Sequence, residues 1–133
     1  MAVLVDSSVW IAGANPRNKE CLALQRLIKK NELLYVTRPI QVEVCQGAKT
    51  EEEFHRLWDA FLGFEFLEIS TRIWGTSAWN YFRLRKRGKT LSTLDCLIGT
   101  LSSEYGVPLW TLDGTLREAR SIIGFDLYGS DDV

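Results

Sequence analysis

The sequence predicts an α/β fold in which a short parallel sheet lies between layers of helices, giving three layers. Short, β-branched apolar runs alternate with longer stretches whose apolar residues recur at helical spacing. This alternation implies right-handed crossovers onto a parallel sheet. The chain has 133 residues, 46 % of them hydrophobic, which is enough for one core, and it shows no repeat or low-complexity linker. We therefore expect a single domain over residues 1–133.

The first elements follow this alternation. Ala2–Val5 is too short and too β-branched for a helix, so it is predicted to be a buried strand. Ser7 or Ser8 is expected to cap a helix that ends near Gly13. Residues 19–30 carry apolar side chains at helical spacing and predict a second helix.

A second strand and two further helices come next. The strand is predicted at Leu33–Val36, and Thr37 is expected to cap the following helix, with Pro39 in its first turn. That helix should end near Gly47. Residues 51–62 predict another helix, with one apolar face made of Phe54, Leu57, Trp58 and Phe61.

The second half of the chain continues the alternation of predicted strands and helices. Glycines and prolines end its predicted helices. The predicted elements are a strand at 64–69, helices at 71–87 and 92–105, a strand within 108–114, a helix at 115–123 and an edge strand at 125–129. The acidic end of the chain, residues 130–133, is expected to fray.

Charge and cysteine content exclude several classes of protein. The formal net charge is -1, so any contact with nucleic acid must depend on a local patch. Cys21, Cys45 and Cys96 are widely spaced and fit neither a disulfide framework nor a zinc site, so we expect three free thiols. The start of the chain lacks the pattern of a signal peptide, and no apolar run approaches the roughly 18 residues of a membrane span. We expect no membrane association and a reducing cytoplasm.

Four acidic residues stand out by their positions. Asp6 and Asp113 each follow the carboxyl end of a predicted strand. Parallel α/β sheets bind ligands at the carboxyl ends of their strands. Glu43 lies between two valines, so it is either a surface residue or a carboxylate in an apolar setting. Asp95 either completes a capping box with Ser92 or belongs to a site.

These carboxylates would need a cation if they met. Two carboxylates about 4 Å apart repel by about 4 kcal/mol at an effective dielectric constant near 20. An all-oxygen cluster suits Mg²⁺ or Mn²⁺ better than zinc. Such a metal ion activates water and shields a phosphodiester during displacement.

Other catalytic chemistries find little support. His55 is the only histidine and lies on a predicted amphipathic helix, which excludes a nuclease with two catalytic histidines. No glycine-rich phosphate-binding loop is present. Ser7 and Ser8 have no plausible histidine partner for nucleophilic catalysis.

Three segments span nearly the whole chain, and they are "VLVDSSVWI", "VTRPIQVEVCQGAKTEEEFHRLWDAFLGFEFLEI" and "LSTLDCLIGTLSSEYGVPLWTLDGTL". In order and spacing they resemble the PIN-domain family, and most closely the VapC toxins of bacterial toxin–antitoxin pairs. The resemblance implies a PIN-like domain with Mg²⁺- or Mn²⁺-dependent endoribonuclease activity. It also implies an RNA substrate, a homodimer, and a VapB-like antitoxin whose C-terminal segment covers the toxin's groove and acidic pocket.

The resemblance assigns roles to individual residues. It implies that Asp6, Asp95 and Asp113 bind metal and that Glu43 helps to hold the metal or orients water. Ser8, and more weakly Thr111 and Thr115, would support them. Many members of the family carry a second acid just after the fourth, where this chain has Gly114 and Thr115, so the ligands of a second metal ion are open.

A basic stretch is the candidate contact with RNA. It could equally be solvated charge that complements the helix dipole. Its members are Arg83, Arg85, Lys86, Arg87 and Lys89.

Two other functional classes stay open. One is a doubly wound phosphatase or phosphotransfer domain, which would usually carry a second acid where Ser8 stands. The other is a catalytically silent PIN-like interaction module, in which the four acids would be separable surface residues.

Overall fold

The computed structural model describes residues 2–129, so the predicted fraying of residues 130–133 lies outside the described residues. The chain forms two compact units, one up to Leu67 and one from Glu68 onward, called unit one and unit two below. The prediction of a single domain over residues 1–133 stays a prediction. No helix among the described residues is long and apolar enough to cross a membrane.

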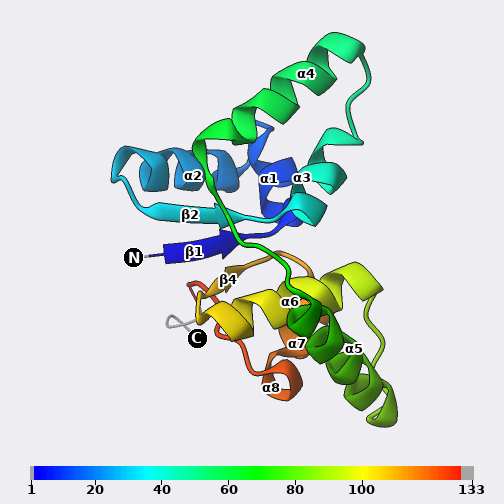
Figure 1. The fold of residues 1–133 in the computed structure, drawn as a ribbon. Coiled ribbons are helices and arrows are strands. Elements are labelled where there is room, and N and C mark those ends of the chain that lie inside the picture. Colours follow the sequence, from blue (N-terminus) through cyan, green and yellow to red (C-terminus); the bar gives the residue numbers. More distant parts are fainter. Residues whose placement is uncertain (1, 130–133) are drawn as a thin grey trace. The chain divides into compact units, whose positions relative to one another are not determined.

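Unit one contains three short parallel strands. Figure 1 labels two of them, β1 and β2, beside the helices of this unit. Strand β2 lies between β1 and β3, and Ala2 is paired with Leu33 and Tyr35 with Glu65. The strands are β1 (Ala2–Val5), β2 (Leu33–Val36) and β3 (Glu65–Phe66). The helices are α1 (Ser7–Gly13), α2 (Lys19–Lys29), α3 (Arg38–Cys45), α4 (Glu51–Ala60) and the 3-10 helix η1 (Phe61–Gly63).

Unit two is mostly helical. Its short strand forms an isolated parallel bridge between Leu109 and Leu127, and the Leu109 amide donates to the Asp126 carbonyl at 2.8 Å. The elements are α5 (Thr71–Lys86), α6 (Thr93–Tyr105), β4 (Leu109–Trp110), α7 (Gly114–Glu118) and α8 (Arg120–Ile123). The predicted α/β class, short parallel strands flanked by helices, is confirmed.

Three predicted elements differ in the structure. The edge strand predicted at 125–129 is reduced to the single bridge residue Leu127. The strand predicted at 64–69 has only the two residues of β3, because the chain leaves unit one at Leu67, whose amide still donates to the Val36 carbonyl at 2.9 Å. The helix predicted at 115–123 is split at Ala119 into α7 and α8. In one straight helix, six residues would turn Ile122 about 120° away from Leu116, and the break allows both side chains to be buried.

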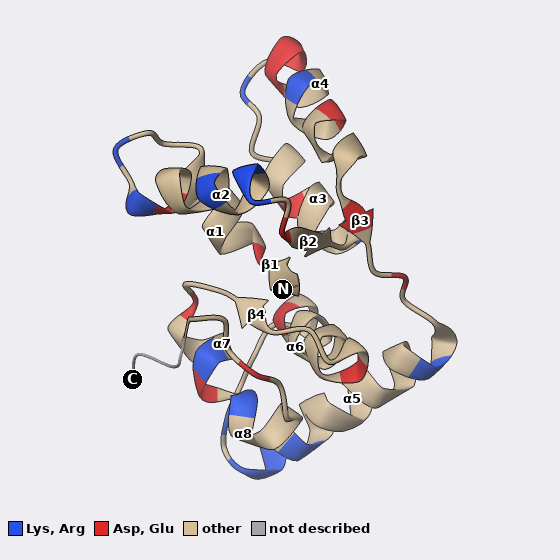
Figure 2. Ribbon diagram, turned by 90° about the vertical axis from the view of Figure 1, so that its left-hand side faces the viewer, with Lys and Arg blue, Asp and Glu red and all other residues tan. Residues whose placement is uncertain are grey.

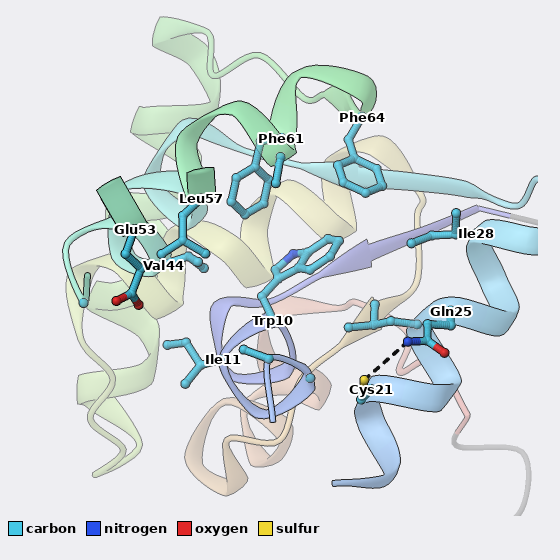
Figure 3. Close-up of a pocket in the computed structure, with 15 residues that line it drawn as sticks. Trp10, Ile11, Cys21, Gln25, Ile28, Val44, Glu53, Leu57, Phe61 and Phe64 are labelled. Carbon is cyan, nitrogen blue, oxygen red and sulfur yellow. Dashed lines mark hydrogen bonds between the residues drawn. The ribbon is translucent and has the colours of Figure 1, made fainter. Parts of the chain in front are cut away.

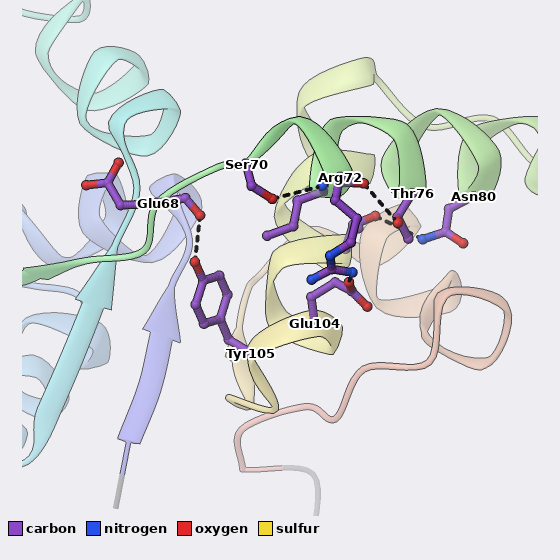
Figure 4. Close-up of polar contacts among 9 residues, drawn as sticks. Glu68, Ser70, Arg72, Thr76, Asn80, Glu104 and Tyr105 are labelled. Atoms are coloured by element: carbon purple, nitrogen blue, oxygen red, sulfur yellow. Dashed lines mark hydrogen bonds and ion pairs between the residues drawn. The ribbon is translucent and has the colours of Figure 1, made fainter.

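Polar contacts tie α5 and the segment just before it to α6 within unit two (Figure 4). Arg72 forms an ion pair with Glu104, and the Tyr105 hydroxyl donates to the Glu68 carbonyl at 2.7 Å. In the buried layer between the helices, the Asn80 amide donates to Thr100 Oγ1 at 3.0 Å. A buried amide with its partner satisfied favours one packing of the two helices over others.

The three cysteines are free thiols, as predicted. Cys45 and Cys96 are buried, and burial raises the pKa of both thiols. Cys21 is half-buried. Because thiolates are the reactive form, burial and raised pKa make Cys45 and Cys96 poorly reactive.

Candidate active site

Asp6 lies where strand β1 meets helix α1. Its side chain is 2 % exposed, and Ser8 Oγ donates to its Oδ2 at 2.8 Å. The prediction that Ser7 or Ser8 caps α1 is wrong, because Asp6 occupies the N-cap position and the helix begins at Ser7. Even so, the Asp6 side chain makes no capping hydrogen bond. Because the side chain of this buried carboxylate does not cap its helix, Asp6 is a candidate for a functional site rather than a helix cap.

Glu43 is the second predicted carboxylate in unit one. It is half-buried on α3, which packs against α1, and its Oε1 accepts a hydrogen bond from Ser7 Oγ at 3.1 Å. The two serines that follow Asp6 therefore hold both carboxylates. The role of Ser7 is missing from the sequence analysis, although the repeated serine directly after Asp6 is the signal that could have revealed it.

Asp95 lies in the first turn of α6 in unit two and is half-buried. Ser92 is the N-cap of this helix, and its Oγ accepts from the Asp95 amide at 3.0 Å. This bond confirms one half of the predicted capping box. It fixes the backbone of Asp95 through Ser92, so it does not by itself require the Asp95 carboxylate for capping.

Asp113 is the N-cap of α7, a helix that packs against α6. Its Oδ1 accepts from the Leu116 amide at 3.0 Å. Thr111 is fully buried, and its Oγ1 accepts from the Asp113 amide at 3.1 Å, so Thr111 fixes the turn that carries the acid. Thr115, in contrast, is exposed on α7.

Asp113 thus caps a helix in addition to its predicted role in the site. We expect Asp113→Ala to lower the free energy of unfolding by about 1 kcal/mol, because the Leu116 amide loses its acceptor. Asp113→Asn should keep the cap and leave stability nearly unchanged, since asparagine caps helices as well as aspartate does. Urea unfolding of both variants without metal measures the difference, and equal losses would contradict the capping role.

The donor atoms of these residues suit a hard cation. Two of the predicted carboxylates lie in unit one and two in unit two, and among residues 2–129 neither unit by itself forms a group of three or more metal-ligating side chains. Mg²⁺ is commonly held by one or two carboxylates, with water and substrate phosphate completing its shell. The oxygen donors present, carboxylates supported by hydroxyls, fit Mg²⁺ or Mn²⁺, and the roles of the individual residues stay predictions.

A second feature of unit one is an apolar pocket of about 420 Å³ (Figure 3). Trp10 forms its floor, with ring centroids 5.4 Å from Phe61 and 5.2 Å from Phe64. The indole nitrogen of Trp10 donates to the Val5 carbonyl at 3.1 Å, which fixes the ring. Residues of α1, α2, α3 and α4 complete the wall, including the exposed Ile28.

The predicted apolar face of α4 is incompletely buried. Phe61 is buried and Leu57 partly buried, whereas Phe54 and Trp58 are exposed. Helical periodicity predicts which residues share a face, but it cannot show whether that face is fully covered. Here Leu57 and Phe61 line the pocket, whereas the exposed Phe54 and Trp58 lie outside it.

The residues of the basic stretch differ in their exposure and in their contacts. Arg85, Lys86, Arg87 and Lys89 are exposed at the end of α5. Arg83 is half-buried, and its Nη2 donates to Asn80 Oδ1 at 2.7 Å and to the Ile122 carbonyl at 2.8 Å. Arg83 therefore holds α8 against α5. His55 is exposed on α4 near Glu51, as predicted.

Comparisons with known proteins identify the fold. A family model described as "PIN domain" matches residues 3–121. A search of curated proteins finds no match.

Several solved structures share the fold. VapBC-1 of nontypeable Haemophilus influenzae has a TM-score of 0.78 at 15 % identity, covering 96 % of this chain and 97 % of the other. VapBC2 of Rickettsia felis, bound to a promoter DNA fragment, has a TM-score of 0.77 at 18 % identity, covering 96 % and 98 %. VapC20 of Mycobacterium tuberculosis, a toxin that cleaves the sarcin-ricin loop, has a TM-score of 0.70 at 15 % identity, covering 92 % and 95 %.

Proposed function

The chain belongs to the PIN domain family, and we propose that it is a divalent-metal-dependent endoribonuclease, the toxin of a toxin–antitoxin pair. The family match over residues 3–121 carries the proposal, because that range includes all four acids. The buried Asp6, held by Ser8 without capping its helix, supports it from the structure. The similarity in fold to VapC toxins agrees with the same function.

The proposed mechanism assigns a task to each acid. Asp6, Asp95 and Asp113 would hold Mg²⁺ or Mn²⁺, which when bound supplies an activated water and neutralises charge on the phosphodiester. Ser8 fixes the orientation of the Asp6 carboxylate, and Thr111 fixes the turn of Asp113. Glu43, oriented by Ser7, would position the attacking water or help to hold the metal.

The apolar pocket of unit one supports a protein partner. We propose that a VapB-like antitoxin inserts apolar side chains there, against Trp10, Ile28 and Phe64. The solved relatives include toxin–antitoxin complexes, which supports a partner of this kind. The predicted homodimer and cytoplasmic location are proposed on the same basis.

The alternatives predict different activities. A phosphatase or phosphotransfer domain would hydrolyse a small phosphoester, and family membership makes that alternative less favoured than a nuclease. A catalytically silent PIN-like module would cleave neither RNA nor a phosphoester.

The deciding experiment is cleavage of a mixed pool of cellular RNA by the purified chain. We expect discrete cuts with Mg²⁺ or Mn²⁺ and none with EDTA, because the carboxylates need the cation to act on a phosphodiester. Sequencing of the new RNA ends would then identify the target. Cuts that persist in EDTA would contradict metal dependence, and hydrolysis of a small phosphoester without RNA cleavage would favour the phosphatase.

A further inference from the structure

The outer face of helix α5 carries an exposed pair of aromatic rings. Trp79 is 57 % exposed and Phe82 is 49 % exposed, and their rings are stacked, with centroids 5.4 Å apart and planes at 19°. Lys86 Nζ lies 5.4 Å from the centroid of Phe82. The three residues are spaced i, i+3 and i+7, so they share one face of the helix. We call these three residues the α5 platform.

The core of unit two does not use the α5 platform. The buried residues of α5 are Ile73, Ser77, Asn80 and Leu84, which lie on the opposite face. Exposed aromatic rings cost free energy in water unless a partner covers them. A flat ligand can cover the rings by stacking on them, and the cation of Lys86 beside them favours a ligand with negative charge.

The charged residues of helix α5 itself are all basic. No Asp or Glu occurs between Glu68 and Asp95, although the whole chain has a net charge of -1. Figure 2 shows Lys and Arg gathered at the C-terminal end of α5 and on α8, which packs against it. The exposed cations there are Arg85, Lys86, Arg87, Lys89 and Arg120. The net charge of the chain conceals this local positive region.

We propose that the α5 platform binds single-stranded RNA, with bases stacked on Trp79 and Phe82 and phosphates beside Lys86 and its basic neighbours. The proposal rests on the proposed function and adds to it a binding surface for the substrate. Aromatic rings interleaved with cations are the chemistry by which proteins bind single strands without reading a particular sequence. A second copy of the chain is a poorer occupant, because two basic surfaces would face each other.

Helix α4 provides a matched control in the same chain. Phe54 and Trp58 are also exposed and stacked, with centroids 6.2 Å apart and planes at 15°. Their helix begins with Glu51, Glu52 and Glu53 instead of basic residues. Negative charge repels RNA phosphates, so this second pair should contribute little to RNA binding.

The test measures binding of a fluorescently labelled single-stranded RNA oligonucleotide by anisotropy, in EDTA to prevent cleavage. We expect Trp79→Leu to weaken binding about tenfold and Trp79→Leu with Phe82→Leu to weaken it further, because the bases lose their stacking surface. Lys86→Gln should reduce the salt dependence of binding, since one phosphate contact is lost. The control pair Phe54→Leu and Trp58→Leu should leave affinity unchanged. Leucine favours helix, and thermal melting followed by circular dichroism checks that each variant is folded.

The outcomes separate this inference from the proposed function. Unchanged RNA affinity in the Trp79 and Phe82 variants, with cleavage by the wild type, would overturn the inference alone. A change in mass by analytical ultracentrifugation without a change in RNA affinity would show a self-association surface and overturn it as well. Binding that depends on Trp79, in a wild-type chain that cleaves no RNA with metal, would support the inference and contradict only the nuclease.

Discussion

Asp6→Asn is expected to reduce metal-dependent RNA cleavage by about two to three orders of magnitude while the chain stays folded. The proposed metal loses its buried carboxylate, and metal stabilisation of developing charge contributes several kcal/mol to catalysis. Stability in EDTA should stay unchanged or rise, because the Asp6 side chain does not cap α1 and the substitution removes a buried negative charge. The amide oxygen of asparagine can still accept the Ser8 hydrogen bond.

Asp59→Asn is the control for this prediction. Asp59 is exposed on α4 and belongs to no predicted site, so its substitution removes the same charge and should leave cleavage unchanged. Initial cleavage rates with Mg²⁺ and urea unfolding in EDTA measure the two effects. If Asp6→Asn unfolded the chain in EDTA, Asp6 would be a structural residue, and if the variant cleaved RNA as fast as the wild type, Asp6 would not be a metal ligand.

Ile28→Asp is expected to weaken binding of the antitoxin by at least about a hundredfold without changing RNA cleavage. Ile28 lines the apolar pocket and is 48 % exposed, so the substitution places a carboxylate where the partner's apolar side chains would be buried. Burying an unpaired charge costs several kcal/mol, and each 1.4 kcal/mol corresponds to a factor of ten in affinity. Isothermal titration with the proposed VapB-like antitoxin measures the loss.

Leu22→Asp is the matched control for the pocket. Leu22 lies on the same helix and is 51 % exposed, but it does not line the pocket. Its substitution should leave antitoxin affinity unchanged. Equal effects at the two positions would contradict the pocket as the docking site.

Thiol labelling gives an independent measurement. Cys21 lines the pocket, whereas Cys45 and Cys96 are buried with raised pKa values, so a thiol reagent at neutral pH should modify Cys21 first. A bound antitoxin should slow this modification in the wild type and in Leu22→Asp, but not in Ile28→Asp.

The sequence by itself determined most of the elements and their order. Ala2–Val5 and Leu33–Val36 were predicted with the bounds that the structure shows, because short apolar runs next to capping residues carry a local signal. Thr37 was likewise predicted to cap α3, and it does. The split at Ala119 could not be read from periodicity, because it depends on burying Leu116 and Ile122 against the rest of unit two.

The same division holds for the functional residues. The positions of the acids after strands and in first turns follow from local sequence, and the resemblance in motifs named the family that the comparison confirms. Only the tertiary structure shows that Ser7 on α1 reaches Glu43 on α3, that Arg83 is bound to the Ile122 carbonyl, and that the α4 face opens into a pocket. These contacts join residues far apart in the chain, and they are decided by how helices pack rather than by the residues next to each one.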